Sequence, residues 1–448
     1  MTTAAVTPGR SFFGEPPALG FLAFTEAWER FSYYGMISLL ALYMSTALFL
    51  PGHIEHIAGF ASFRAGLESV FGKMGTPALA SQVFGLYTGA VYFTPIFGGL
   101  IADRLIGRRR AVMLGAVLMS AGHLAMAFEQ SFLLALLLLV TGCGLLKGNI
   151  STQVGQLYRE DDVAGRARGF SIFSMGINVG AVVGPIACGF LGIRYGWHWG
   201  FGLAGILMLF GLATYIAGYR LLTETTVRHP EARKEPLTSA QFRVIAGLFA
   251  VMALTIFQSV AFYQNSNIGQ IWIKARVDLT VFGFVIPPPW FNAINSFVSI
   301  LFVPVLLALW AWQARRGHEP REIAKIATGA FITVGANLIL ALGSLLPAPV
   351  SPLFSVGYET LLGIGFLYYW PTLLALVSRL APPSLKATLM GCVFLTLSVS
   401  NFTIGNLGAL YTTMTPAAFW SLEAAIAAAG GVLAFLLRKP LERLLTTP

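Results

Sequence analysis

The composition of the chain excludes a soluble globular protein. Of its 448 residues, 56% are hydrophobic and 11% carry a charge, whereas soluble domains carry about 25% charged residues. We therefore predict a membrane protein that crosses the bilayer many times. The formal net charge of +10 raises the separate question of a nucleic-acid partner, which the placement of the basic residues answers.

Long apolar segments recur along the whole chain. A membrane-spanning helix needs about 20 mainly apolar residues. On this criterion we predict twelve spans, at residues 19–50, 78–103, 110–128, 131–157, 168–192, 198–222, 241–272, 286–312, 323–346, 352–378, 386–412 and 415–437. An even number of spans places both termini on the same side of the membrane.

The basic residues set the orientation. Of the 29 Lys and Arg residues, 22 fall in the two tails and the loops on one side, five fall on the other side, and Arg30 and Lys147 lie inside spans. The positive-inside rule makes the side with 22 cytoplasmic. We therefore expect a multi-pass protein of the plasma (inner) membrane with cytoplasmic termini. The positive charge is explained by topology, and we expect no nucleic-acid partner.

A charged, Pro-containing segment at residues 223–240 separates the sixth span from the seventh. We interpret it as a cytoplasmic linker between two six-helix bundles, 19–222 and 241–437, with cytoplasmic tails at 1–18 and 438–448. This organisation is typical of major-facilitator-type transporters. The predicted fold is an all-α membrane protein with twelve transmembrane helices in two six-helix halves. Substrate and ion sites of such transporters lie near the midplane.

The first span carries an unusual cluster of charges. Glu26, Glu29 and Arg30 lie within five residues of each other, and a charge at bilayer depth costs at least about 2.5–3.5 kcal/mol. Glu26 and Arg30 are four residues apart, so they share one helix face, and Tyr33 and Tyr34 extend that face with hydroxyl groups. Burial favours a protonated carboxyl whereas a guanidinium favours an ionised one. The cluster is therefore either a proton-exchanging site or a static ion network.

Two further motifs occur in the first half. Lys147 lies about ten residues from the cytoplasmic end of the fourth span, so it needs an acidic partner, for which the first-span carboxylates are candidates. The run from Gly98 to Arg110 ends the second span with two glycines and a basic loop. Its Asp103 and Arg104 are predicted gating residues, because Asp103 can cap a helix or pair with a basic neighbour.

Four motifs, in order, resemble those of the proton-dependent oligopeptide transporter family of the major facilitator superfamily. They are Glu26-x-x-Glu29-Arg30-Phe31-x-Tyr33-Tyr34-Gly35, Gly98-Gly99-x-x-Ala102-Asp103-Arg104, Gly144-Leu145-Leu146-Lys147-x-Asn149-Ile150-Ser151 and Phe173-Ser174-Met175-Gly176-Ile177-Asn178-Val179-Gly180. The resemblance covers the first half strongly and weakens after residue 240. It implies that Glu26, Glu29, Arg30 and Lys147 couple proton movement to transport. It also implies a substrate site made by Arg30, Tyr33, Tyr34, Tyr92, Lys147, Asn178 and Asn295.

Three positions depart from the family pattern. Gln264 stands where the family usually has a seventh-span acid, and Ile37 stands where it usually has an arginine. Losing both members of a buried pair leaves no unpaired charge. Phe366 stands where a tenth-span glutamate normally receives the peptide amino group. Glu359, about two turns away, either takes over that role or is a helix residue of the outer mouth that faces water; it and Gln264 complete the predicted substrate site.

We therefore predict a proton-coupled symporter that imports di- and tripeptides by alternating access, monomeric in the lipid bilayer, with the proton as coupling ion and no cofactor. One alternative is a proton-coupled transporter of a non-peptide anionic metabolite, and another is a proton-driven drug exporter. An enzyme is not expected, because the chain offers no candidate nucleophile–base pair. Its three Cys and six His residues show no metal-ligand spacing, and we expect no bound metal.

Overall fold

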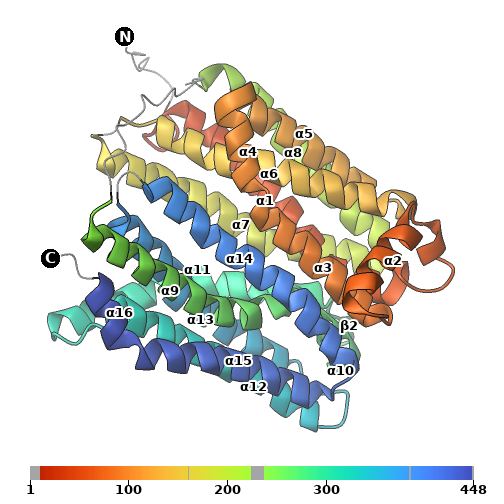
Figure 1. Ribbon diagram of the computed structural model, residues 1–448. Coiled ribbons are helices and arrows are strands. Elements are labelled where there is room, and N and C mark those ends of the chain that lie inside the picture. The colour runs from red at the N-terminus through yellow and green to blue at the C-terminus, as the bar shows by residue number, and fades with distance from the viewer. Residues whose placement is uncertain (1–10, 160, 223–236, 383–384, 446–448) are drawn as a thin grey trace. The chain divides into compact units, whose positions relative to one another are not determined.

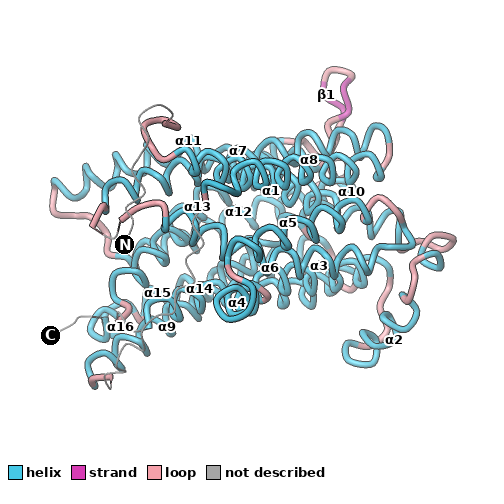
Figure 2. Tube along the Cα trace, turned by 90° about the horizontal axis from the view of Figure 1, so that it is seen from above, coloured by secondary structure: helices cyan, strands magenta, loops and turns pink. Residues whose placement is uncertain are grey.

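The computed structural model describes residues 11–159, 161–222, 237–382 and 385–445. Helices make up most of this part of the chain (Figure 2). A helix satisfies its own backbone hydrogen bonds, which is what a segment in lipid requires. The first ten residues of the predicted N-terminal tail, most of the predicted linker and the last three residues lie outside the described residues.

The first of two compact units comprises residues 1–39, 55–60 and 94–228. The helices of this unit are α1 (Pro17–Tyr43), α4 (Pro95–Ile101), α5 (Arg108–Ala125), α6 (Phe132–Gln156), α7 (Val163–Tyr195) and α8 (Trp197–Gly218) (Figure 1). Shorter helical turns of the chain are η1 (Met44–Leu48), η2 (Ile54–His56), η3 (Ala102–Ile106), η4 (Glu129–Ser131), η5 (Tyr219–Leu221), η6 (Gln264–Ser266) and η8 (Leu410–Thr412).

The second unit comprises residues 40–54, 61–93 and 229–448. Its helices are α2 (Phe60–Phe71), α3 (Thr76–Phe93), α9 (Ser239–Tyr263), α10 (Ile268–Arg276), α11 (Pro289–Arg315), α12 (Glu322–Leu345), α13 (Leu353–Leu380), α14 (Lys386–Ala409), α15 (Pro416–Leu436) and α16 (Arg438–Leu445). A two-stranded hairpin, β1 (Thr280–Val281) and β2 (Phe284–Val285), precedes α11. The helix α3 groups with this unit because it packs along α14 (Figure 1). The predicted bundle boundaries stay a prediction.

Every predicted span corresponds to a helical segment. Within the described residues, eleven helical segments are long and apolar enough to cross a membrane. The remaining predicted span, 110–128, corresponds to α5, which is 18 residues long and starts with three arginines. In the first unit this helix packs against α6 and α8. The chain is therefore an all-α, multi-pass membrane protein, as its composition predicts.

Two of the predicted spans are not continuous helices. The second is divided at Pro95 into α3 and α4, because proline lacks the N–H that an uninterrupted helix would use. The seventh, predicted as one helix over 241–272, is divided at the polar run Gln264 to Asn267 into α9 and α10. These side chains form hydrogen bonds with other helices, a tertiary effect that apolar periodicity does not reveal.

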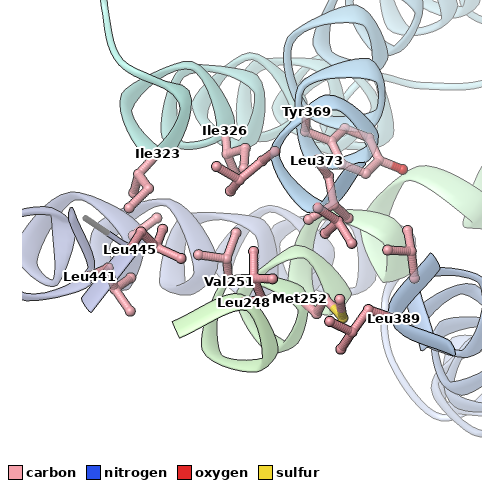
Figure 3. Packing of buried hydrophobic residues seen from close by; sticks show 14 of the residues in the cluster. Leu248, Val251, Met252, Ile323, Ile326, Tyr369, Leu373, Leu389, Leu441 and Leu445 are labelled. Carbon is pink, nitrogen blue, oxygen red and sulfur yellow. The ribbon is translucent and has the colours of Figure 1, made fainter. Parts of the chain in front are cut away.

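The cytoplasmic tail predicted at 438–448 contains a helix, α16. Its Leu441 and Leu445 are four residues apart and buried, which gives this short helix one apolar face. In Figure 3 these two leucines lie in a hydrophobic cluster with side chains from α9, α12, α13 and α14. The labelled members from those helices are Leu248, Val251, Met252, Ile323, Ile326, Tyr369, Leu373 and Leu389. The helix α16 is thus packed into the second unit.

Adjacent glycines on α4 provide a matched test of helix packing in the first unit. A β-carbon on Gly98 would overlap the backbone carbonyl of Gly144 on α6, whereas one on Gly99 would meet nothing within 4 Å. Overpacking costs about 1–3 kcal/mol. We expect Gly98→Ala to lower the Tm of the detergent-solubilised protein, measured by intrinsic fluorescence, and Gly99→Ala to leave it unchanged. Equal Tm values for the two variants would contradict this close approach.

Candidate functional site

Three glycines on α7 place α1 in the first unit. Gly176, Gly180 and Gly184 recur every four residues, a small-residue spacing that lets two helix backbones approach closely. A β-carbon on Gly180 would lie 2.7 Å from the carbonyl oxygen of Ala27 and 2.8 Å from the β-carbon of Arg30. The charged turn of α1 is therefore held against the backbone of α7.

The three charges of α1 form one buried cluster. The Nε atom of Arg30 lies 3.1 Å from Oε1 of Glu26 and closer still to Oε2 of Glu29. All three side chains are at most 4% exposed. The guanidinium is also in hydrogen-bond contact with the hydroxyl of Tyr34. One cation thus holds two carboxylates, and Glu26 Oε2 and Glu29 Oε1 make no hydrogen bond within the described residues. Each can accept a proton.

Lys147 on α6 joins this cluster. Its Nζ atom lies 5.8 Å from the centroid of the Tyr33 ring, and the guanidinium carbon of Arg30 lies 5.4 Å from the same centroid. Lys147 interacts electrostatically with Glu26, Glu29 and Arg30. The ring of Tyr33 therefore faces two cations, an arrangement that cation–π attraction stabilises. Lys147 is half-buried, whereas Arg30 is buried.

The other predicted residues of the first unit lie elsewhere. Asn178 is exposed on α7, two residues from the glycine that contacts α1. Asp103, in the helical turn η3 that follows α4, pairs at 2.9 Å with Arg108, the first residue of α5. Arg104 is exposed in the same helical turn. The structure thus joins Asp103 to a basic neighbour, one of the two interactions that the sequence allows.

In the second unit, Glu359 is buried rather than exposed. Its carboxyl is 0% exposed, so the alternative of an outer-mouth residue that faces water is wrong. Asn295 donates to Oε2 of Glu359 at 2.8 Å, and Asn265 donates to the same oxygen at 3.5 Å. The predicted pocket asparagine and the predicted substitute acid are therefore partners. Both lie where α11 and α13 pack together.

Aromatic side chains surround the position where the family usually has a glutamate. The ring of Phe366 stacks on Phe262 at 5.3 Å and lies 6.4 Å from the ring of Trp370. Tyr92 belongs to the same unit, and its ring lies 6.2 Å from that of Tyr263. Phe366 thus packs in an apolar environment, which offers no carboxylate to an ammonium group.

The sequence analysis missed one residue, Glu423 on α15. This carboxyl is 0% exposed, and its Oε1 accepts a hydrogen bond of 2.9 Å from Nε2 of Gln264. A signal for it was present, because Glu423 is an ionisable residue in an apolar span, and such residues commonly mark a functional site. The predicted substrate residue Gln264 is therefore bound to a buried acid of the last span.

Comparisons with known proteins agree with this architecture. The family model described as Major Facilitator Superfamily matches residues 19–405. The chain is 30% identical to the peptide transporter YePEPT of Yersinia enterocolitica over 99% of this chain and 98% of that protein. It is 29% identical to a di-/tripeptide transporter of Lactococcus lactis subsp. cremoris over 97% of this chain and 98% of that protein.

Solved structures show the same likeness. A peptide transporter POT in complex with sulfate superposes with a TM-score of 0.85, at 26% identity over 99% of this chain and 98% of that chain. A POT family transporter in complex with 5-aminolevulinic acid gives a TM-score of 0.83, at 25% identity over 97% of this chain and 98% of that chain. The likeness therefore extends over nearly the whole length of both chains.

Proposed function

Because the chain belongs to the proton-dependent oligopeptide transporter family of the major facilitator superfamily, we propose that it is a proton-coupled symporter that imports di- and tripeptides by alternating access. It is a transporter and not an enzyme. The observation that carries the proposal is the cluster on α1, where one buried guanidinium holds two carboxylates beside Lys147.

The proton acts on this cluster. A proton taken up by Glu29 or Glu26 removes a negative charge that holds Arg30. Removing one partner of a buried ion pair leaves the other uncompensated and costs about 3–5 kcal/mol. Protonation therefore allows Arg30 and Lys147 to bind a new anionic partner. The ring of Tyr33, which both cations face, holds them in position for it.

The carboxylate of the substrate is that partner. Hydrogen bonds between charged groups are short and oriented, so Arg30 and Lys147 hold a peptide by its carboxyl end. Tyr33, Tyr34 and Asn178 supply hydroxyl and amide groups to a peptide backbone. Proton and substrate then leave together, and a membrane potential of 100 mV supplies about 2.3 kcal/mol for each charge moved. Tyr92, Gln264, Asn295 and Glu359 stay predicted substrate-binding residues, and Asp103 and Arg104 stay predicted gating residues.

The orientation follows from the basic loops. The positive-inside rule supports cytoplasmic termini in the plasma (inner) membrane, with the ends of α3 and α9 that adjoin α2 and α10 on the outside. Import then runs from the outside toward the cytoplasmic side, where the basic loops lie. The predicted monomer needs no second copy to complete the charge cluster, since α1, α6 and α7 all belong to the first unit.

Uptake of labelled dialanine into proteoliposomes tests the proposal. We expect accumulation with an inward proton gradient and only equilibration without one, because the gradient drives symport of peptide and proton. The measurement is the internal radioactivity with and without a protonophore. No uptake by a preparation that is folded and monodisperse would contradict peptide transport and leave a non-peptide anion as the substrate.

A non-peptide anionic metabolite is the second candidate. Phe366 places an aromatic ring where the family has an acid, and Glu359 is enclosed by two amide donors, so neither of these two positions presents a free carboxylate to an amino group. Competition of N-acetyl-dialanine against free dialanine separates the two candidates. Stronger competition by the free peptide supports a peptide site, and equal or stronger competition by the acetylated compound supports an anion site without amino-group recognition.

A further inference from the structure

The break in the seventh span gathers polar side chains inside the second unit. Between α9 and α10 the chain reads Gln264-Asn265-Ser266-Asn267, and the backbone of Asn267 leaves the helical conformation with φ −100° and ψ −101°. Gln264 donates to Glu423 of α15 at 2.9 Å, and Asn265 donates to Glu359 of α13 at 3.5 Å. Neighbouring residues of one break thus bind two buried carboxyl groups on different helices.

Neither carboxyl has a cationic partner. No Lys, Arg or His of the described residues forms an ion pair with Glu359 or Glu423. Glu423 is the less compensated of the two, because Gln264 is its one hydrogen-bond donor among the described side chains, whereas Glu359 has two amide donors. Its second oxygen, Oε2, is buried and makes no hydrogen bond in this part of the chain.

An unused hydroxyl group lies beside these carboxyls. Tyr358 is 0% exposed, and its hydroxyl makes no hydrogen bond within the described residues. It interacts electrostatically with both Glu359 and Glu423. Its ring lies 5.6 Å from that of Trp420, which precedes Glu423 by three residues and so shares its helix face. A tyrosine hydroxyl can donate to an ionised carboxylate or accept from a protonated one.

These features suit a carboxyl that exchanges a proton. An ionised carboxylate in a low-dielectric interior without a cation carries a penalty of several kcal/mol, and one amide donor offsets only part of it. A neutral carboxylic acid avoids that penalty. Oε2 of Glu423 and the hydroxyl of Tyr358 both make no hydrogen bond within the described residues, so the hydroxyl is a free donor that a small rotation of the side chain would bring to Oε2 once the acid has released its proton.

We propose that Glu423 is a second proton-binding residue of this transporter, with Gln264 and Tyr358 as its positioning residues. The inference rests on the proposed proton-coupled function and adds a site in the second unit to the one on α1. In the step itself, a hydronium ion gives a proton to Oε2 of the ionised Glu423 and becomes water, and on release the same O–H bond breaks as a water molecule takes the proton and becomes hydronium.

Among the described residues, no other charged group compensates the buried carboxyl of Glu423. Tyr358 of α13 interacts electrostatically with both Glu423 and Glu359. Tyr411 of η8 contacts the neighbouring Phe419, and Arg276 of α10 interacts with Tyr411 rather than with Glu423. Arg243, the basic residue of α9, and the two charged residues of α12, Glu322 and Lys325, belong to the opposite ends of those helices. The ionisation of Glu423 therefore depends mainly on solvent access and on its two positioning residues.

The hydrogen bonds of Gln264 link this site to two further helices. Asn267 donates to Oε1 of Gln264 at 3.1 Å, to the hydroxyl of Ser81 on α3 at 2.7 Å, and to the carbonyl oxygen of Ile404 on α14 at 3.4 Å. If the hydrogen bond between Glu423 and Gln264 changes, the hydrogen bonds of Asn267 to α3 and α14 change with it. This gives protonation a route to helix movement, since a group that binds two states differently shifts their populations.

Infrared difference spectroscopy on the full-length protein in lipid vesicles tests the proposal directly. We expect a carboxylic-acid C=O band that disappears as the pH is raised and is missing from the Glu423→Gln variant. Gln264→Leu, which removes the amide donor and keeps the acid, is expected to shift the frequency and the pH midpoint of that band. Glu442→Gln, at an exposed ion pair with Arg321, is the control and should leave the band unchanged.

Transport measurements then separate a proton site from a structural carboxyl. We expect Glu423→Gln to reduce the accumulation ratio of dialanine at least tenfold and to retain exchange of internal for external peptide. A pH-independent band together with wild-type accumulation in Glu423→Gln would overturn the proposal. If Glu423→Gln does not fold, an unshifted band in Gln264→Leu overturns it. A titrating Glu423 band in a protein that shows no proton-driven uptake would instead refute the proposed function and leave the proton site standing.

Discussion

Replacing Glu29 by Gln is expected to abolish proton-driven accumulation of dialanine while leaving exchange of labelled for unlabelled peptide. Glu29 is 0% exposed and paired with Arg30, and the amide keeps its shape but cannot gain or lose a proton. The variant resembles the protonated state permanently, so substrate still binds and crosses without coupling. The measurement is the accumulation ratio in proteoliposomes, set against counterflow in the same vesicles.

The Arg64–Glu68 pair on α2 provides the matched control. It has the same four-residue spacing as Glu26 and Arg30, with an N–O distance of 2.8 Å, but it is partly exposed. The hydrogen bond from Arg64 holds the pKa of the Glu68 carboxyl below its usual value, so this group stays ionised at the pH of the assay. Glu68→Gln should therefore transport like the wild type. Undiminished accumulation in Glu29→Gln would show that Glu29 is not the coupling residue.

Replacing Lys147 by Met should weaken substrate binding strongly. Methionine keeps the length of the side chain and removes the ammonium that, in the proposed cycle, holds the substrate carboxylate. A hydrogen bond to a charged group contributes about 1.5–3 kcal/mol, so we expect the KM for dialanine to rise about 10- to 100-fold. Initial rates of uptake over a range of peptide concentrations give this value directly.

We expect Lys147→Met to fold like the wild type, because Lys147 is only half-buried. Lys73→Met, at an exposed loop position, is the control and should leave the KM unchanged. The same comparison made with a peptide amide, which lacks the carboxylate, should show no difference between the wild type and Lys147→Met. A wild-type KM for dialanine in Lys147→Met would remove this residue from the binding site.

Local sequence determined the membrane-spanning segments and the first charge cluster. Apolar runs of sufficient length must be helical in lipid, so each predicted span is helical, although the second and the seventh are each divided into two helices. Glu26 and Arg30 meet because four residues make about one helical turn, and the four-residue spacing of Gly176, Gly180 and Gly184 anticipates close helix contact. Such features depend on neighbours within one or two turns, and a single sequence contains all of that information.

Tertiary packing decided the rest. Gln264 and Glu423 are 159 positions apart, and no periodicity relates them, because α9 and α15 become neighbours only when the helices pack. The same reason explains why the burial of Glu359 and the aromatic surroundings of Phe366 could not be predicted. The break at Gln264 to Asn267 depends on partners in five other helices, which satisfy polar side chains that a continuous helix would have left in an apolar environment. The sequence thus determined which residues could carry chemistry, and the packing of distant helices decided which of them face one another.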